Sequence, residues 1–152
     1  MLSRPRDEPQ TAESDRTAGA ARQRTTLFAR RDLSARDARE FVAETLTQWG
    51  CRERLDDVRL CASELVTNAL RHGAPADRLI LVRLELHGVE LLIEVHDGGK
   101  GTPRQREAQD TSDDGRGLFL VSAVADDWGV AARQGPGKRV WASFMLPAET
   151  AC

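Results

Sequence analysis

Three polar side chains recur along the segment SELVTNALRHG (residues 63–73), and their spacing brings them together if the segment is helical. At about 100° per residue, Glu64, Asn68 and Arg71 fall on one narrow strip, opposite the apolar side chains of the same segment. A carboxylate can act as a base, an amide oxygen suits Mg²⁺, and a guanidinium stabilises negative charge. Taken alone, the strip is explained more simply as solvated helix surface.

A second group of residues follows an alternating apolar segment, in the sequence HDGGKG (residues 96–101). Asp97 shares its face with Val95, so the alternation directs its carboxylate toward the buried side, where an ionised group is costly unless it is paired. Such a carboxylate could accept a hydrogen bond from an exocyclic amine such as N6 of adenine, while Gly99 and Gly101 let the backbone approach a flat ring. The alternative is an ordinary turn aspartate that bonds to its own loop.

A third group, in DDGRGLFLV (residues 113–121), places glycines at the expected start of a helix. Backbone N–H groups at a helix N-terminus, helped by the helix dipole, form a site for phosphate. The motif lacks the lysine of a P-loop and does not follow a strand as a dinucleotide fingerprint does, so a plain helix-start turn is the alternative. The residues concerned are Gly115, Arg116, Gly117 and Leu118.

Hydrophobic periodicity predicts the elements that would position these groups. Ser34 with Asp37 resembles a capping box at the start of the first helix, and Gly50 ends that helix. A polar loop is expected over 98–114. The predicted strands are 24–30, 79–87, 90–97, 128–133 and 138–147, and the predicted helices are 34–49, 54–72 and 115–126. This order favours helices on one face of a mainly antiparallel sheet, that is, an α/β (α+β) two-layer sandwich.

Length, composition and charge limit the expected number of domains and the expected cellular location. The chain has 152 residues, 40% of them hydrophobic and 30% charged, as expected for one soluble globular domain. A net charge of −2 gives no electrostatic reason to expect nucleic acid or membrane binding. Residues 1–22 are predicted to be a disordered tail, 23–147 a folded domain and 148–152 a short C-terminal tail. With no signal-peptide core in the sequence, the cytoplasm is the expected location.

The three motifs, in this order and at this spacing, resemble the GHKL superfamily of ATP-binding domains, which have the Bergerat fold. The resemblance covers residues 24–147. Within the superfamily, ARDAREFVAETLTQWG (35–50) and ASELVTNALRHG (62–73) resemble the stand-alone bacterial anti-sigma-factor serine/threonine kinases of partner-switching systems. This implies a two-layer sandwich with a mixed, mostly antiparallel sheet. It also implies a protein that binds Mg²⁺-ATP and a sigma factor and phosphorylates a small antagonist protein.

The resemblance also implies a role for each motif residue. Asn68 would hold Mg²⁺, Glu64 would be the general base, and Arg71 would lie near the phosphates. Asp97 would read adenine, with Gly99 and Gly101 lining the base pocket. The loop 102–114 would be the ATP lid, and the backbone N–H groups that contact the phosphates would come from Gly115, Arg116, Gly117 and Leu118.

One feature departs from the family pattern. Many relatives carry a threonine early in the last strand that helps to read adenine, but this chain has Arg139 and Val140 there. Ser143 comes later and, by alternation from Val140, lies on the other face. One adenine contact is therefore expected to be absent or replaced. The alternative function is a module that binds ATP and a protein partner without kinase activity. Since relatives often dimerise, the resemblance also implies a homodimer.

Overall fold

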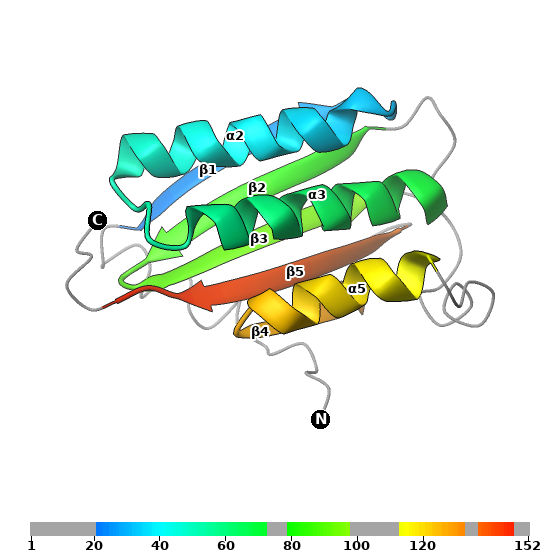
Figure 1. Ribbon diagram of the computed structural model, residues 1–152. Coiled ribbons are helices and arrows are strands. Elements are labelled where there is room, and N and C mark those ends of the chain that lie inside the picture. Colours follow the sequence, from blue (N-terminus) through cyan, green and yellow to red (C-terminus); the bar gives the residue numbers. More distant parts are fainter. Residues whose placement is uncertain (1–20, 73–78, 98–112, 133–136, 148–152) are drawn as a thin grey trace.

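Among the described residues of this computed structural model, three helices cover one face of a five-stranded sheet (Figure 1). The structure describes residues 21–72, 79–97, 113–132 and 137–147, and for 72, 113–117 and 132 only the backbone. The strands are β1 (Arg22–Phe28), β2 (Ile80–His87), β3 (Glu90–Asp97), β4 (Asp127–Ala132) and β5 (Lys138–Met145). The helices are α2 (Leu33–Trp49), α3 (Leu55–His72) and α5 (Asp113–Val124).

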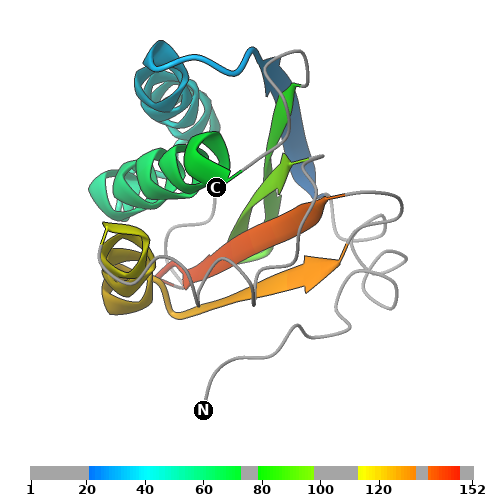
Figure 2. The ribbon, with the colours of Figure 1, turned by 90° about the vertical axis from the view of Figure 1, so that its right-hand side faces the viewer.

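The order of elements and the two-layer arrangement are those predicted from the sequence, and Figure 2 shows the helix layer and the sheet layer edge-on. The strand order is β1-β2-β3-β5-β4, and every pairing among the described strands is antiparallel. Strand β5 pairs antiparallel with β3, and in this register the first residue of β5, Lys138, is directly opposite the last residue of β3, Asp97. This register joins two chain segments at one end of the sheet.

The core lies between the helices and the facing side of the sheet. Alternate residues of β2, β3 and β5 point into it, as the apolar alternation predicts. Helices α2 and α3 each contribute an apolar stripe to the core, and the spacing of its residues fits the helical period. Fully burying one such large aliphatic side chain contributes about 1.5–3 kcal/mol. The largest fully buried aliphatic side chains are Leu46, Leu65, Ile80, Leu84, Leu91, Ile93, Val42, Val58, Val66 and Val82.

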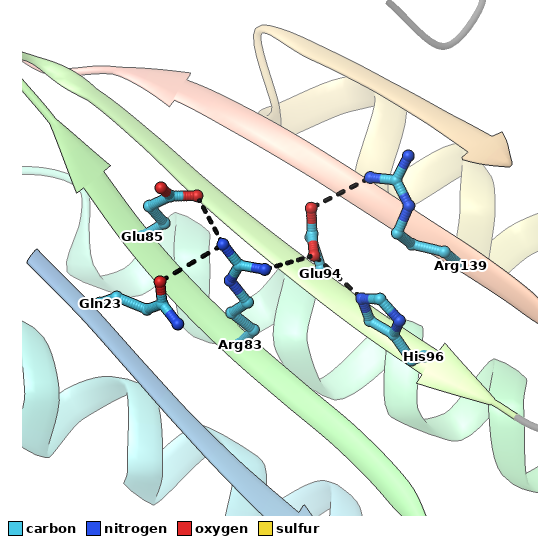
Figure 3. A network of polar contacts seen from close by, with 6 residues as sticks. All are labelled: Gln23, Arg83, Glu85, Glu94, His96 and Arg139. Atoms are coloured by element: carbon cyan, nitrogen blue, oxygen red, sulfur yellow. Dashed lines mark hydrogen bonds and ion pairs between the residues drawn. The ribbon is translucent and has the colours of Figure 1, made fainter. Parts of the chain in front are cut away.

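The face of the sheet turned away from the helices carries a charged network centred on Glu94 (Figure 3). Arg139 Nη1 lies 3.0 Å from Glu94 Oε2, and His96 Nε2 lies 2.9 Å from Glu94 Oε1. Arg83 is 3.9 Å from Glu94 and 3.2 Å from Glu85. Burial alone would raise the pKa of Glu94, but the hydrogen bond from His96 and the charges of Arg139, His96 and Arg83 outweigh it. The pKa of this carboxyl therefore lies below its usual value.

A tryptophan also packs on this second face. Trp141 of β5 is buried, and its cross-strand neighbour on β4 is Gly129. A Cβ atom built on Gly129 would lie 2.9 Å from Cζ2 of the indole ring. The absence of a side chain at position 129 therefore lets the ring lie against the β4 backbone.

The start of α2 differs from the prediction. The N-cap residue is Asp32, and Ser34 lies inside the helix with its hydroxyl donating to the carbonyl of Ala29, so the predicted capping box is wrong. The other end is as expected: Gly50, at φ 76°, ends α2 and its N–H reaches Leu46 O and Thr47 O.

Strand β1 begins at Arg22, one residue before the predicted start of the domain, and pairs there with Leu86. Residues 1–20 of the predicted tail, residues 98–112 of the predicted loop and the C-terminal segment 148–152 lie outside the described residues. In the part of the chain that is described, no helix has the length and apolar character needed to cross a membrane.

Candidate functional site

The predicted strip on α3 lies in the C-terminal half of that helix. Glu64 and Asn68 are half-buried and Arg71 is exposed, whereas Leu65 and Ala69 beside them are buried in the core. The helical period places this strip opposite the apolar stripe, but Glu64 and Asn68 are half-buried, so this part of α3 is not fully solvated. In the helix layer, α3 lies between α2 and α5 (Figure 1).

Asp97 ends β3 on the side that faces the helices, and its side chain is only 1% exposed. A buried carboxylate needs a partner, and Arg30, 5% exposed, supplies one: Nη1 lies 3.3 Å from Asp97 Oδ1. Arg30 lies just after β1 and is separated from Asp97 by 67 residues along the chain. Sequence reasoning identified the buried carboxylate but missed its cationic partner.

The same guanidinium also contacts the last turns of α3. Arg30 Nη2 donates to the carbonyl oxygen of Ala69 at 2.6 Å and to that of Leu70 at 3.3 Å. The last carbonyls of a helix lack intrahelical donors, and a cation there is favourable. Arg30 therefore ties the end of β3 to the segment of α3 that directly follows Asn68.

Lys138 is the second cation that the sequence reasoning did not single out. It is 4% exposed, pairs in register with Asp97, and its Nζ donates to Asn68 Oδ1 at 3.4 Å. That distance is at the long end of the range for a hydrogen bond. We call Arg30, Asn68, Asp97 and Lys138 the end-of-sheet cluster. It joins two of the three predicted motifs through contacts between residues about 70 positions apart.

The third motif lies in the first turns of α5. The predicted start of this helix at residue 115 is wrong by two residues, because α5 begins at Asp113 and Gly115, Arg116 and Gly117 lie inside it. The backbone N–H groups of the first four residues of a helix have no acceptor within the helix, and in α5 these residues are 113–116. Gly115 and Arg116 can therefore donate to a ligand, whereas Gly117 and Leu118 lie in the second turn. Leu118 is half-buried and packs against the core.

The N-terminal end of α5 lies at the same end of the molecule as the C-terminal end of α3, the last residues of β3 and the start of β5 (Figure 1). The fold therefore gathers the described parts of all three motifs at one end of the sheet. Gly99 and Gly101, and residues 102–112 of the predicted lid, lie outside the described residues.

The predicted difference at the start of the last strand can be located on β5. Val140 points into the core, while Ser143 is buried and, by alternation, belongs to the opposite face. On the helix-facing side, Lys138 stands next to Asp97. A cationic donor therefore occupies the position beside the predicted adenine-reading carboxylate.

The donors present suit a magnesium ion that arrives together with phosphate. Among the described residues, no group of three or more His, Cys, Asp or Glu side chains could hold a metal by itself. Mg²⁺ in phosphate sites takes one or two protein oxygens, the remaining ligands being waters and phosphate oxygens. Asn68 Oδ1 is an oxygen of the kind that Mg²⁺ accepts, and Lys138 Nζ, 3.4 Å away, would compete with the ion for it.

Comparisons with known proteins identify a family and similar solved structures. The family model described as "Histidine kinase-like ATPase domain" matches residues 28–144. None of the curated proteins compared with the chain matches it. A solved structure of the RsbU and RsbW domains of Rv1364c from Mycobacterium tuberculosis is similar, with a TM-score of 0.62 and 18% identity over 82% of this chain. The chain spans 32% of the length of that structure, and at this identity the likeness concerns the fold alone.

A second structure, the histidine kinase domain of a blue-light-activated histidine kinase from Erythrobacter litoralis, has a TM-score of 0.48 and 23% identity. The alignment covers 74% of this chain and 61% of that one.

Proposed function

The chain belongs to the histidine kinase-like ATPase domain family, an ATP-binding family, and we propose that it transfers phosphate from ATP to a serine or threonine of a small antagonist protein. In this proposal it also binds a sigma factor in the cytoplasm, and the antagonist controls that binding. A homodimer is the proposed form of the protein. The family match over residues 28–144, together with the convergence of Asn68 and Asp97 in the end-of-sheet cluster, is the observation that carries the proposal.

Nucleotide binding would use one group from each motif. Asp97 would accept a hydrogen bond from N6 of adenine, with Gly99 and Gly101 beside the ring. The start of α5, with Gly115 and Arg116 and then Gly117 and Leu118, would lie along the phosphates. Arg71, exposed at the end of α3, would add positive charge there. Mg²⁺, when bound with Asn68 as a ligand, would neutralise phosphate charge.

In the transfer step, Glu64 would take the proton of the acceptor hydroxyl. That oxygen would form a bond to the γ-phosphorus, and the bond between this phosphorus and the β–γ bridging oxygen would break, releasing ADP. Phosphoryl transfer requires positioning and charge stabilisation more than covalent help. The half-buried position of Glu64, one turn before Asn68 on the same strip, supports this role.

Binding is tested by titrating a fluorescent ATP analogue, with and without Mg²⁺, into the wild type and Asp97→Asn. Asp97→Asn keeps the shape of the side chain but loses its charge. Saturable binding to the wild type, at least tenfold weaker in the variant, is expected. If the wild type shows no saturable binding, the nucleotide assignment is refuted.

Catalysis is tested by incubating the protein with Mg²⁺-ATP and a small antagonist-like protein encoded beside it. A mass increase of one phosphate on a serine or threonine of the antagonist is expected with the wild type. It should be lost with Glu64→Gln and retained with Glu44→Gln, since Glu44 is an exposed glutamate of α2. Loss in both variants, or in neither, would contradict the role of Glu64.

The second candidate is a binding module that holds ATP without spending it. The contact from Lys138 Nζ to Asn68 Oδ1 favours this candidate, because it engages the oxygen that would hold Mg²⁺, and phosphoryl transfer depends on that ion. Under this alternative, ATP binds and changes the affinity for a protein partner, but no phosphate is transferred. Measured ATP binding with an unmodified antagonist after prolonged incubation would select it.

A further inference from the structure

We propose that Arg30 is a specificity-determining residue of the nucleotide site: it competes with the purine base for Asp97 and thereby sets both the affinity for ATP and the selectivity against 6-oxopurines. The inference rests on the proposed assignment of Asp97 to the base. It goes beyond that assignment because Arg30 belongs to none of the three sequence motifs.

The competition follows from burial and geometry. Both side chains are almost fully buried, so the Arg30–Asp97 contact is shielded from water and salt. A base amine that donates to Asp97 meets Arg30 Nη1, which lies 3.3 Å from Asp97 Oδ1 and draws on the same negative charge. Base binding and the ion pair therefore compete for one carboxylate group.

The guanidinium is held more closely by α3 than by Asp97. Its contact with Ala69 O is 2.6 Å, whereas charge-assisted contacts to carboxylates usually measure about 2.7–2.9 Å and this one is 3.3 Å. The contact with Asp97 is thus the more easily broken of the two. Arg30 can release the carboxylate and remain bonded to the end of α3.

Breaking the Arg30–Asp97 ion pair should lower the affinity of the protein for ATP. In the wild type, part of the gain from the adenine–Asp97 hydrogen bond is offset by loss of the ion pair. With methionine at position 30, the carboxylate has lost this cation before the base arrives. Since a hydrogen bond to a charged group contributes about 1.5–3 kcal/mol, at least about tenfold tighter ATP binding is expected for Arg30→Met.

The base selectivity distinguishes competition from a merely structural role. Inosine triphosphate carries a carbonyl oxygen in place of the N6 amine, so at this position it cannot donate to Asp97 but can accept from Arg30 Nη1. Arg30 therefore lowers the preference for ATP over inosine triphosphate. Arg30→Met should raise this preference about tenfold or more, because it favours ATP and removes the donor for the oxo group.

The experiment measures ATP and inosine triphosphate binding by calorimetry, with Mg²⁺, for the wild type, Arg30→Met and Arg31→Met. Arg31 is the adjacent, exposed arginine and controls for loss of one positive charge. Tighter ATP binding and increased selectivity in Arg30→Met, with neither change in Arg31→Met, would support the inference. If the wild type binds ATP but Arg30→Met binds it no more tightly and with unchanged selectivity, the inference is overturned while the proposed function stands.

Failure of every protein to bind either nucleotide would instead refute the proposed function. If Arg30→Met does not fold, the wild type still provides a test through NMR of its arginine side chains, with Arg30→Lys used for assignment. The Arg30 guanidinium signals should shift and exchange faster with solvent when ATP is added. Signals that stay unchanged at saturating ATP would overturn the inference.

Discussion

Replacing Glu94 tests whether the charged network on the face of the sheet turned away from the helices stabilises the fold. Glu94 is 6% exposed and contacts Arg139, His96 and Arg83. Glu94→Gln keeps the shape of the side chain but removes the negative charge that these three groups share. Removing one partner of a fully buried ion pair costs about 3–5 kcal/mol. Because the three partners remain partly hydrated, we expect the free energy of unfolding to fall by about 2–3 kcal/mol at pH 7.

The pH dependence of this loss follows from the lowered pKa of Glu94. A carboxyl whose pKa is lower in the folded state than in the unfolded state stabilises the fold above its unfolded pKa of about 4.3. That stabilisation disappears as the pH falls through the folded-state pKa. The difference between wild type and Glu94→Gln should therefore be complete at pH 7 and should shrink steadily below about pH 4.

Urea unfolding followed by circular dichroism at several pH values measures both effects. At pH 7 the midpoint for Glu94→Gln should fall by about 1–2 M. The control is Glu40→Gln, because Glu40 pairs with Arg36 at 3.8 Å on the exposed surface of α2 and should contribute less than about 0.5 kcal/mol. Equal losses in the two variants, or a Glu94→Gln loss that stays constant down to pH 3, would refute the reasoning.

Three further predictions concern single residues. Burial, together with the charges of Asp57 and Glu64 and against that of Arg54, raises the pKa of the Cys61 thiol to about 12. Peptide-resolved maleimide labelling at pH 8 should therefore modify Cys61 only in urea, and its contribution to stability should decline as the pH rises from about 8.5 toward 12. Gly129→Ala should cost about 1–3 kcal/mol of unfolding free energy and change the near-ultraviolet circular dichroism, because the new methyl group meets the Trp141 ring. Arg54 donates to Asp57, Asp126 and two backbone carbonyls, so Arg54→Lys should lower the melting temperature almost as much as Arg54→Met, since one ammonium cannot reproduce the fork.

Much of the fold could be predicted because its periodicities are local. The alternation in 90–97 gave the bounds of β3 and the buried orientation of Asp97. The helical period placed Glu64 and Asn68 opposite the apolar stripe of α3, whereas the structure has both half-buried. Helix starts were less predictable. The α2 N-terminus is not set by Ser34, and α5 begins two residues before Gly115, because cap geometry depends on the preceding turn.

The sequence alone determined which residue types could bind a nucleotide and which helices and strands would carry them. It also determined the family, through three short motifs whose order does not depend on any contact. Only the tertiary structure decided which groups meet. Arg30 reaches Asp97 across 67 residues, and Lys138 reaches Asn68 across 70. Sheet register and helix packing make these contacts, and neither leaves a local pattern, so the two cations beside the candidate site became visible only in the folded chain.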